Sequence, residues 1–148
     1  MSQDAQSEDQ AAHRHLRMGW WSLVVFVSLG VVLETLHGFK EQWYLGLQNE
    51  TRRHLWTLAH AHGTLLGLVH IAVASTIRAK QGWSPQQIRA IWGCVTGAGI
   101  LLPLGFFLGG IWAMGGDPGV FVLLVPPGAA LLIIGALVIA RGLGSNER

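Results

Sequence analysis

Histidine is concentrated in one part of this chain. Four of the seven histidines fall within a stretch of 17 residues, and these are His54, His60, His62 and His70. The apolar segment before this stretch ends with Glu34 and His37. Imidazole and carboxylate groups together suit iron, copper or zinc. If these segments cross a membrane, the ionisable side chains mark a functional site, because they are costly to bury in hydrocarbon.

The composition is that of a membrane protein. Hydrophobic residues make up 51% of the chain and charged residues only 12%, whereas soluble domains carry about 25% charged residues. The apolar residues form four blocks, at about 19–37, 55–77, 91–113 and 120–140. Each block has about the ~20 residues that a helix needs to cross a bilayer and is too continuously apolar for a barrel strand. The sequence therefore predicts an all-α fold, a four-helix transmembrane bundle with up-down-up-down topology.

The domain organisation follows from the same pattern. Residues 1–12 are polar, with no large aliphatic side chain after Met1, and we expect them to form a disordered tail. Residues 13–148 then make up one membrane domain. Because the tail is acidic and the first apolar block ends in polar residues around Glu34, we interpret that block as a retained helix and not as a cleaved signal.

The basic residues favour one orientation in the membrane. Seven of the ten Lys and Arg residues flank the predicted helices on the side that carries both termini, and three lie on the other side. Basic residues are enriched in cytoplasmic loops, so both termini are predicted to be cytoplasmic, in a multi-pass protein of the bacterial inner-membrane kind. Since these residues flank membrane helices, the net charge of +2 indicates contact with a lipid bilayer and not with nucleic acid.

Helical geometry places a carboxylate and two imidazoles together near the outer face. Glu34 and His37 are three residues apart and so share one face of the first helix. With a ~1.5 Å rise per residue, Glu34 lies about 6 Å inside its helix end and His60 about 7–8 Å inside the matching end of the second helix. We expect these three residues to bind a copper or iron ion, and His62 is a candidate metal ligand as well. The loop at 39–53 can cover this site as a short amphipathic segment.

A deeper position offers haem b as the other candidate cofactor. Haem needs one or two imidazoles in an apolar cavity. At ~100° per residue, Gly63, Gly67 and His70 share one face of the second helix, and such small residues let another helix or a flat cofactor approach closely. The candidate haem-binding residues are His60, His62, Gly63, Gly67 and His70. No second histidine is expected at the level of His70, which lies roughly 15 Å deeper than His60.

The two histidines at the centre of the stretch point in different directions. His60 and His62 are ~200° apart around a straight helix, so they cannot bind the same ion. The run His-Ala-His-Gly at 60–63, followed by Leu66 and Gly67, resembles the H-x-H helices of haem–copper oxidase core subunits and of NnrS-type haem–copper membrane proteins. In those families, histidines two apart serve different centres. The resemblance covers one helix of four, and it implies a haem or copper ligand role for both histidines and a link to respiratory or nitric oxide chemistry.

The other histidines and the single cysteine are given structural roles. His13 and His15 precede the first apolar block and are expected to be solvated, as is His54 at the start of the second helix. Cys94 is the only cysteine, which excludes an internal disulfide and a multi-cysteine metal site. Its place in an apolar block is typical of a small packing residue.

The third apolar block carries signals for a helix start and for close packing. Ser84, with Pro85 after it and Gln87 three residues on, predicts a capping box. Glycine pairs four residues apart, the spacing of close helix packing, are Gly93 with Gly97 and Gly105 with Gly109. We expect this glycine-rich helix to join a homo-oligomer or a larger membrane complex.

One leading hypothesis and two alternatives remain. The leading hypothesis is an integral membrane metal- or haem-binding protein with a redox role in electron transport. In the first alternative, Glu34 pairs with His37 or Lys40 in a metal-free polar clasp, and the protein is a structural or accessory subunit of a larger membrane complex. In the second, Glu34, His60 and His70 form a proton or ion pathway. Hydrolytic catalysis is not indicated, because the sequence has no nucleophile–base motif.

Overall fold

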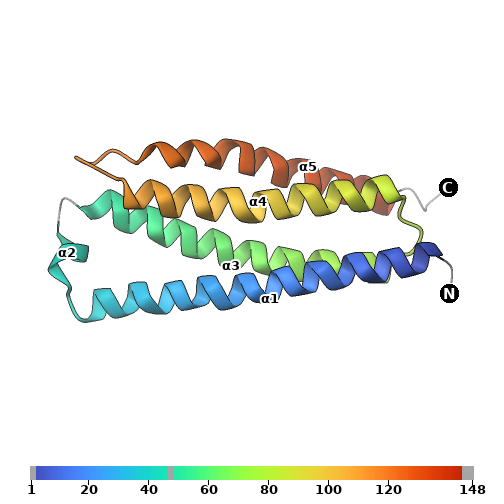
Figure 1. Ribbon diagram of the computed structural model, residues 1–148, viewed down its shortest axis with the longest axis horizontal. Coiled ribbons are helices and arrows are strands. Elements are labelled where there is room, and N and C mark those ends of the chain that lie inside the picture. Colours follow the sequence, from blue (N-terminus) through green and yellow to red (C-terminus); the bar gives the residue numbers. More distant parts are fainter. Residues whose placement is uncertain (1–2, 47–48, 145–148) are drawn as a thin grey trace.

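The chain folds into four long helices that run side by side in alternating directions (Figure 1). The computed structural model describes residues 3–46 and 49–144, with side chains from residue 5 onward. The long helices are α1 (Gln3–Gly38), α3 (Glu50–Ala79), α4 (Pro85–Ile111) and α5 (Val125–Gly144), and the short ones are α2 (Gln42–Leu45) and the 3-10 helix η2 (Val120–Leu124). The predicted all-α, four-helix architecture is confirmed.

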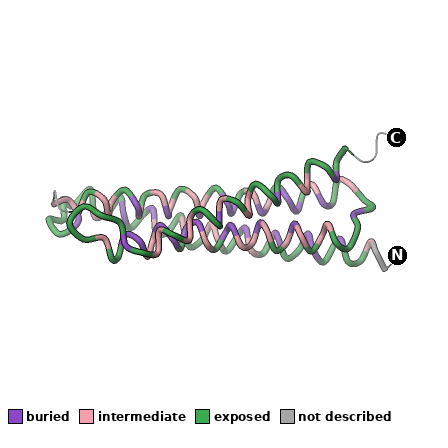
Figure 2. The backbone as a smooth tube through the Cα atoms, turned by 90° about the horizontal axis from the view of Figure 1, so that it is seen from above, coloured by how far each residue is buried: buried purple, intermediate pink, exposed green. Residues whose placement is uncertain are grey.

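The helices pack in the order of the chain. Helix α3 packs between α1 and α4, and α4 packs between α3 and α5, while α1 and α5 make no direct contact in the described part of the chain. Buried positions follow the lines where neighbouring helices meet, and exposed positions follow the outward faces (Figure 2). We call the end of the bundle where α1 begins and α5 ends the terminal end, and the other the α2 end (Figure 1).

The four long helical segments have the length and apolarity needed to cross a bilayer. These segments are Ala5–Gly38, Glu50–Ala79, Pro85–Ile111 and Val120–Gly144, and they contain the predicted spans except for residues 112–113. Large apolar side chains on the outward faces, such as Val31 and Ile133, are more than half exposed, as expected of residues that face lipid. The chain is therefore a multi-pass membrane protein, and the side on which its termini lie stays a prediction.

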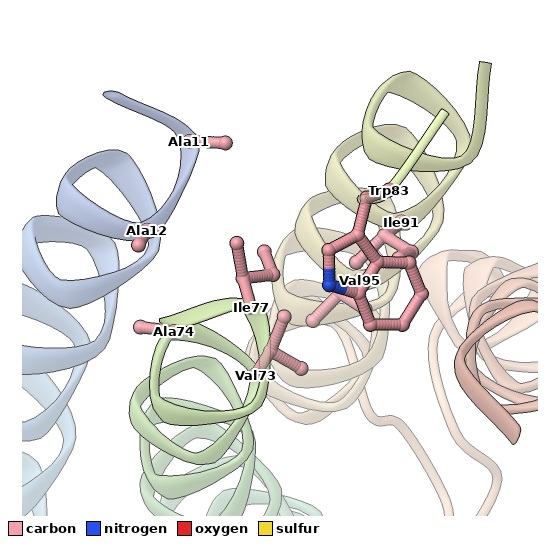
Figure 3. Close-up of a cluster of buried hydrophobic side chains, with 8 residues drawn as sticks. All are labelled: Ala11, Ala12, Val73, Ala74, Ile77, Trp83, Ile91 and Val95. Carbon is pink, nitrogen blue, oxygen red and sulfur yellow. The ribbon is translucent and has the colours of Figure 1, made fainter. Parts of the chain in front are cut away.

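Helix α1 begins earlier than the sequence pattern suggests. Residues 3–12, expected to be a disordered tail, form its first turns. Figure 3 shows Ala11 and Ala12 beside a cluster of apolar side chains from α3, from α4 and from the connection between them. Glu8 accepts hydrogen bonds from the backbone N–H groups of Gly82 (3.0 Å) and Trp83 (2.8 Å) in the connection between α3 and α4. These tertiary contacts stabilise a segment that is too polar to bury itself.

Glycines bring α1 and α3 into backbone contact. A Cβ atom on Gly67 would lie 3.0 Å from the carbonyl oxygen of Gly19, and one on Gly63 would meet the ring of Phe26. One turn from these contacts, the hydroxyl of Ser22 donates to the carbonyl oxygen of Gly63 at 2.9 Å. The small-residue face of α3 is therefore occupied by another helix. The sequence predicts either a helix or a flat cofactor at this face.

The connections around α4 follow local sequence signals. The predicted capping box is confirmed: Ser84 accepts from the backbone N–H of Gln87, whose side chain accepts from the backbone N–H of Ser84. At the other end, positive φ angles at Gly115 and Gly116 turn the chain between Met114 and Asp117. The following segment starts as η2, because prolines at 126 and 127 cannot donate the hydrogen bonds of an α-helix there.

Most glycines of α4 are covered within the chain. A Cβ on Gly97 would lie 2.7 Å from Leu131 of α5, and Cβ atoms on Gly105 and Gly109 would contact the segment that opens the fourth span. Gly93, by contrast, has nothing within 4 Å of its Cβ position among the described residues. The predicted docking of this helix onto a second copy or a larger complex stays a prediction.

Candidate functional site

A groove of about 630 Å³ lies between α1, α2 and α3 at the α2 end of the bundle. Glu34 and His37 line it from the last turns of α1, and His60 lines it from α3. Thr35 of α1, Tyr44 of α2 and Thr57 of α3 complete its polar lining. The equal depth of Glu34 and His60, predicted from the helical rise, is therefore matched by their presence in one groove. The loop expected to cover the site contributes Tyr44.

The orientation of His60 is set by a hydrogen bond across the helix pair. Its Nδ1 lies 2.6 Å from the carbonyl oxygen of Phe26 in α1. Because a carbonyl oxygen only accepts, Nδ1 carries a proton, and in the neutral imidazole Nε2 then presents a lone pair. Metal-binding histidines typically use their second nitrogen in this way. Gly30 faces the ring, and a Cβ at that position would meet its Cε1 atom, so glycine there makes room for the imidazole.

The three predicted ligands share the groove but do not converge on one point. Within residues 5–46 and 49–144, no group of three or more His, Cys, Asp or Glu side chains is placed to hold a metal ion. Glu34 and His37 also form no ion pair or side-chain hydrogen bond with each other in the structure described. The ligand role of Glu34, His37 and His60 therefore stays a prediction, and it requires their side chains to turn inward.

His62 lies outside the groove. Its Nδ1 is 2.9 Å from the carbonyl oxygen of Leu58, one turn earlier in the same helix. Its ring contacts Phe106 of α4, with 4.9 Å between the ring centroids. His60 faces α1 and His62 faces α4, so the prediction that they cannot bind the same ion is consistent with their contacts.

A second hollow of about 700 Å³ adjoins the first. His37, Tyr44 and Thr57 line both, and His54 with Glu50 extends the second toward the start of α3. Arg53 also lines it and donates through Nη1 to the carbonyl oxygen of Leu45 at 2.7 Å. This bond ties α2 to α3, so Tyr44 is held between the two hollows.

Tyr44 gives the α2 end a spectroscopic marker, because it is the only tyrosine in the chain. It is buried and stacks on Trp56, with 6.4 Å between ring centroids. Burial raises the pKa of the Tyr44 phenol above its ordinary value of about 10.

We expect an absorbance titration of tyrosinate in the folded protein to show a midpoint above pH 10. Because the folded pKa is the higher one, the contribution of Tyr44 to stability is present below pH 10 and is lost as the pH rises through the folded pKa. The denatured protein serves as the control and should titrate near pH 10. A folded midpoint at or below that of the denatured chain would contradict a buried phenol.

Two other histidines contact each other near the terminal end of the bundle. Nδ1 of His15 in α1 lies 2.8 Å from Nδ1 of His70 in α3, and the two residues are only 0% and 1% exposed. The expectation that His15 is solvated was wrong, as was the expectation that no histidine is level with His70. The reason is that α1 extends beyond its apolar block, and this carries His15 into the interface. His13, in contrast, is exposed as expected.

The residues expected to hold haem lie in three separate places. His60 faces the groove, His62 faces α4, and His70 faces His15. The face formed by Gly63 and Gly67 is filled by α1. The flat cofactor expected against these glycines would compete with a helix for the same space.

Comparisons of the chain with protein-family models, with curated proteins and with solved structures give no match.

Proposed function

We propose that this membrane protein binds a copper or iron ion in the groove at its α2 end and has a redox role in electron transport. The observation that carries the proposal is the presence of Glu34, His37 and His60 in one groove, contributed by two antiparallel helices. One carboxylate and two imidazoles form a mixed nitrogen and oxygen ligand set, which suits both metals.

The protonation of His60 supports this proposal. Because its Nδ1–H donates to the carbonyl of Phe26, the ring is oriented and Nε2 is free to bind a metal. Glu34 supplies a negative charge that offsets part of the charge of a bound cation. A cation in a membrane protein needs such compensation, since an unpaired charge is costly away from water.

The arrangement favours a metal ion over haem, and the metal content of the purified protein separates the ion from a metal-free clasp. Haem against Gly63 and Gly67 requires the space that α1 occupies. The clasp of Glu34 with His37 or Lys40 is not formed in the described part of the structure, and neither is a converged metal site. A single ion needs only side-chain rotations within the groove.

The test is the metal content of detergent-purified protein from metal-replete cells. We expect stoichiometric copper or iron in the wild type and a loss of at least tenfold in affinity in His37→Ala and His60→Ala. The magnitude follows because loss of a group that merely orients a ligand already costs 10–100-fold. His62→Ala is the matched control, since His62 is on the same helix but faces α4.

Equal metal content in wild type, His37→Ala and His60→Ala would overturn the proposal. An absorption spectrum of the same sample separates the cofactors, because a Soret band would show haem instead. If the wild-type protein contains no metal, the remaining interpretation is a scaffold role in a larger membrane complex.

A further inference from the structure

We infer that His15 and His70 form a binding site for a monovalent copper ion, Cu(I), between α1 and α3. The site is separate from the groove at the α2 end and does not depend on it. The first observation is the geometry of the pair. Two imidazole Nδ1 atoms from helices far apart in sequence lie 2.8 Å from each other, with both side chains fully buried.

In neither ring does a hydrogen bond at Nε2 fix which of the two nitrogens carries the proton. The Nε2 atoms of His15 and His70 are both buried, and neither has a hydrogen-bond partner in the described structure. A neutral imidazole carries one proton, on either nitrogen. In the metal-free protein, the Nδ1–H of one ring donates to the Nδ1 lone pair of the other at 2.8 Å. A shift of that single proton to Nε2 of the same ring leaves a lone pair on both Nδ1 atoms. Two such lone pairs facing each other repel unless a cation lies between them.

The distance between the two Nδ1 atoms suits a metal ion once the two rings move slightly apart. Metal to imidazole nitrogen distances are about 2.0 Å, so two nitrogens on one metal are separated by about 3.3 Å in tetrahedral geometry and about 4 Å in linear geometry. The observed 2.8 Å is shorter by about 0.5–1.2 Å. Rotation of the two side chains can supply this difference without moving the helices.

The surroundings hold the rings in place. The ring of Trp92 in α4 lies edge-on to both imidazoles, at centroid distances of 5.0 Å from His15 and 6.3 Å from His70. Across from His70, Gly99 leaves room for the ring, since a Cβ there would lie 3.3 Å from Nε2. Thr96 stands between these two positions on the same face of α4, and its hydroxyl is buried without a partner in the described structure. The site is thus enclosed by three helices.

The local charge selects a monovalent ion. Glu8, the buried acidic residue of α1, lies two turns from His15, and its Oε1 accepts from the backbone of Gly82 and Trp83. The groups that contact the two imidazoles are neutral. A divalent ion would bring two uncompensated charges into an apolar interior, where charge is expensive. Cu(I) carries one charge, accepts low coordination numbers and is bound by imidazole.

The experiment is a Cu(I) titration of the detergent-purified, metal-free full chain under anaerobic conditions, with bicinchoninate as the competing chelator. The decisive variants are His15→Leu and His15→Met. They are similar in size and apolar, but only methionine offers a soft thioether that binds Cu(I). We expect His15→Leu and His70→Leu to weaken Cu(I) binding at this site at least tenfold, and His15→Met to retain it. His13→Leu, an exposed neighbour on the same helix, is the control.

X-ray absorption at the copper edge gives a readout that a purely structural role would not change. In the wild type it should show Cu(I) of low coordination with nitrogen ligands, and in His15→Met it should show an added sulfur ligand. Unchanged Cu(I) affinity in folded His15→Leu would overturn the inference, as would loss of binding in folded His15→Met. His60→Ala removes a ligand from the groove but should leave the site of His15 and His70 intact. A negative result for the Cu(I) site can therefore be distinguished from a negative result for the metal site in the groove.

Discussion

Replacing Gly67 with leucine is expected to lower the free energy of unfolding by about 1–3 kcal/mol, the usual cost of inserting side-chain volume into a packed interface. A Cβ at this position would lie 3.0 Å from the carbonyl oxygen of Gly19 and 3.2 Å from Cγ of Leu23. The first neighbour is backbone and cannot move by a rotation. A leucine must therefore push α1 away from α3, and thermal unfolding in detergent measures the loss.

Gly93→Leu is the matched control for this prediction. Its Cβ would meet nothing within 4 Å in the described structure, and leucine has a higher helix propensity than glycine by up to ~1 kcal/mol. We expect the control to be neutral or slightly stabilising. If Gly67→Leu unfolds at the same temperature as Gly93→Leu, the close contact of α1 and α3 is not the basis of their packing. Separation of the two helices should also weaken the contact between His15 and His70.

Replacing Glu8 with alanine is expected to destabilise the terminal end strongly. The carboxylate accepts the backbone N–H groups of Gly82 and Trp83, and Glu8 is only 7% exposed. Without it, the buried N–H of Trp83 loses its partner, and an unsatisfied buried donor costs about 1–3 kcal/mol. The first turns of α1 should then detach from the connection between α3 and α4. Limited proteolysis near Arg14, together with thermal unfolding, measures this.

Asp9→Ala separates the effect of Glu8 from that of charge alone. Asp9 is the next residue and forms an ion pair of 3.2 Å with Arg78, but the two side chains are 68% and 47% exposed. Exposed ion pairs contribute about 0–1 kcal/mol, so this variant should be close to wild type. Glu8→Gln keeps one acceptor oxygen and should lie between the two. A stability ranking in which Asp9→Ala is the worst variant would contradict the assigned role of Glu8.

The first turns of α1 have a helical periodicity that their polar composition does not reveal. Residues that face α3 or the connection after it recur every three or four positions, and these are Glu8, Ala12, His15, Gly19, Ser22, Phe26 and Gly30. This is the period of one helical face. The first three of these positions precede the apolar block, so a search for hydrophobic stretches ends before reaching them. A search for helical period in small and polar residues would have included His15.

By itself, the sequence determined the membrane-length helices, the start of α4 and the directions of His60 and His62. Each depends on local quantities: the number of apolar residues, the capping residues or the angle per residue. Only the tertiary structure decided that α1 fills the glycine face of α3 and that His15 meets His70. These contacts join residues dozens of positions apart. They depend on the register between two helices, which the spacing within either helix does not specify.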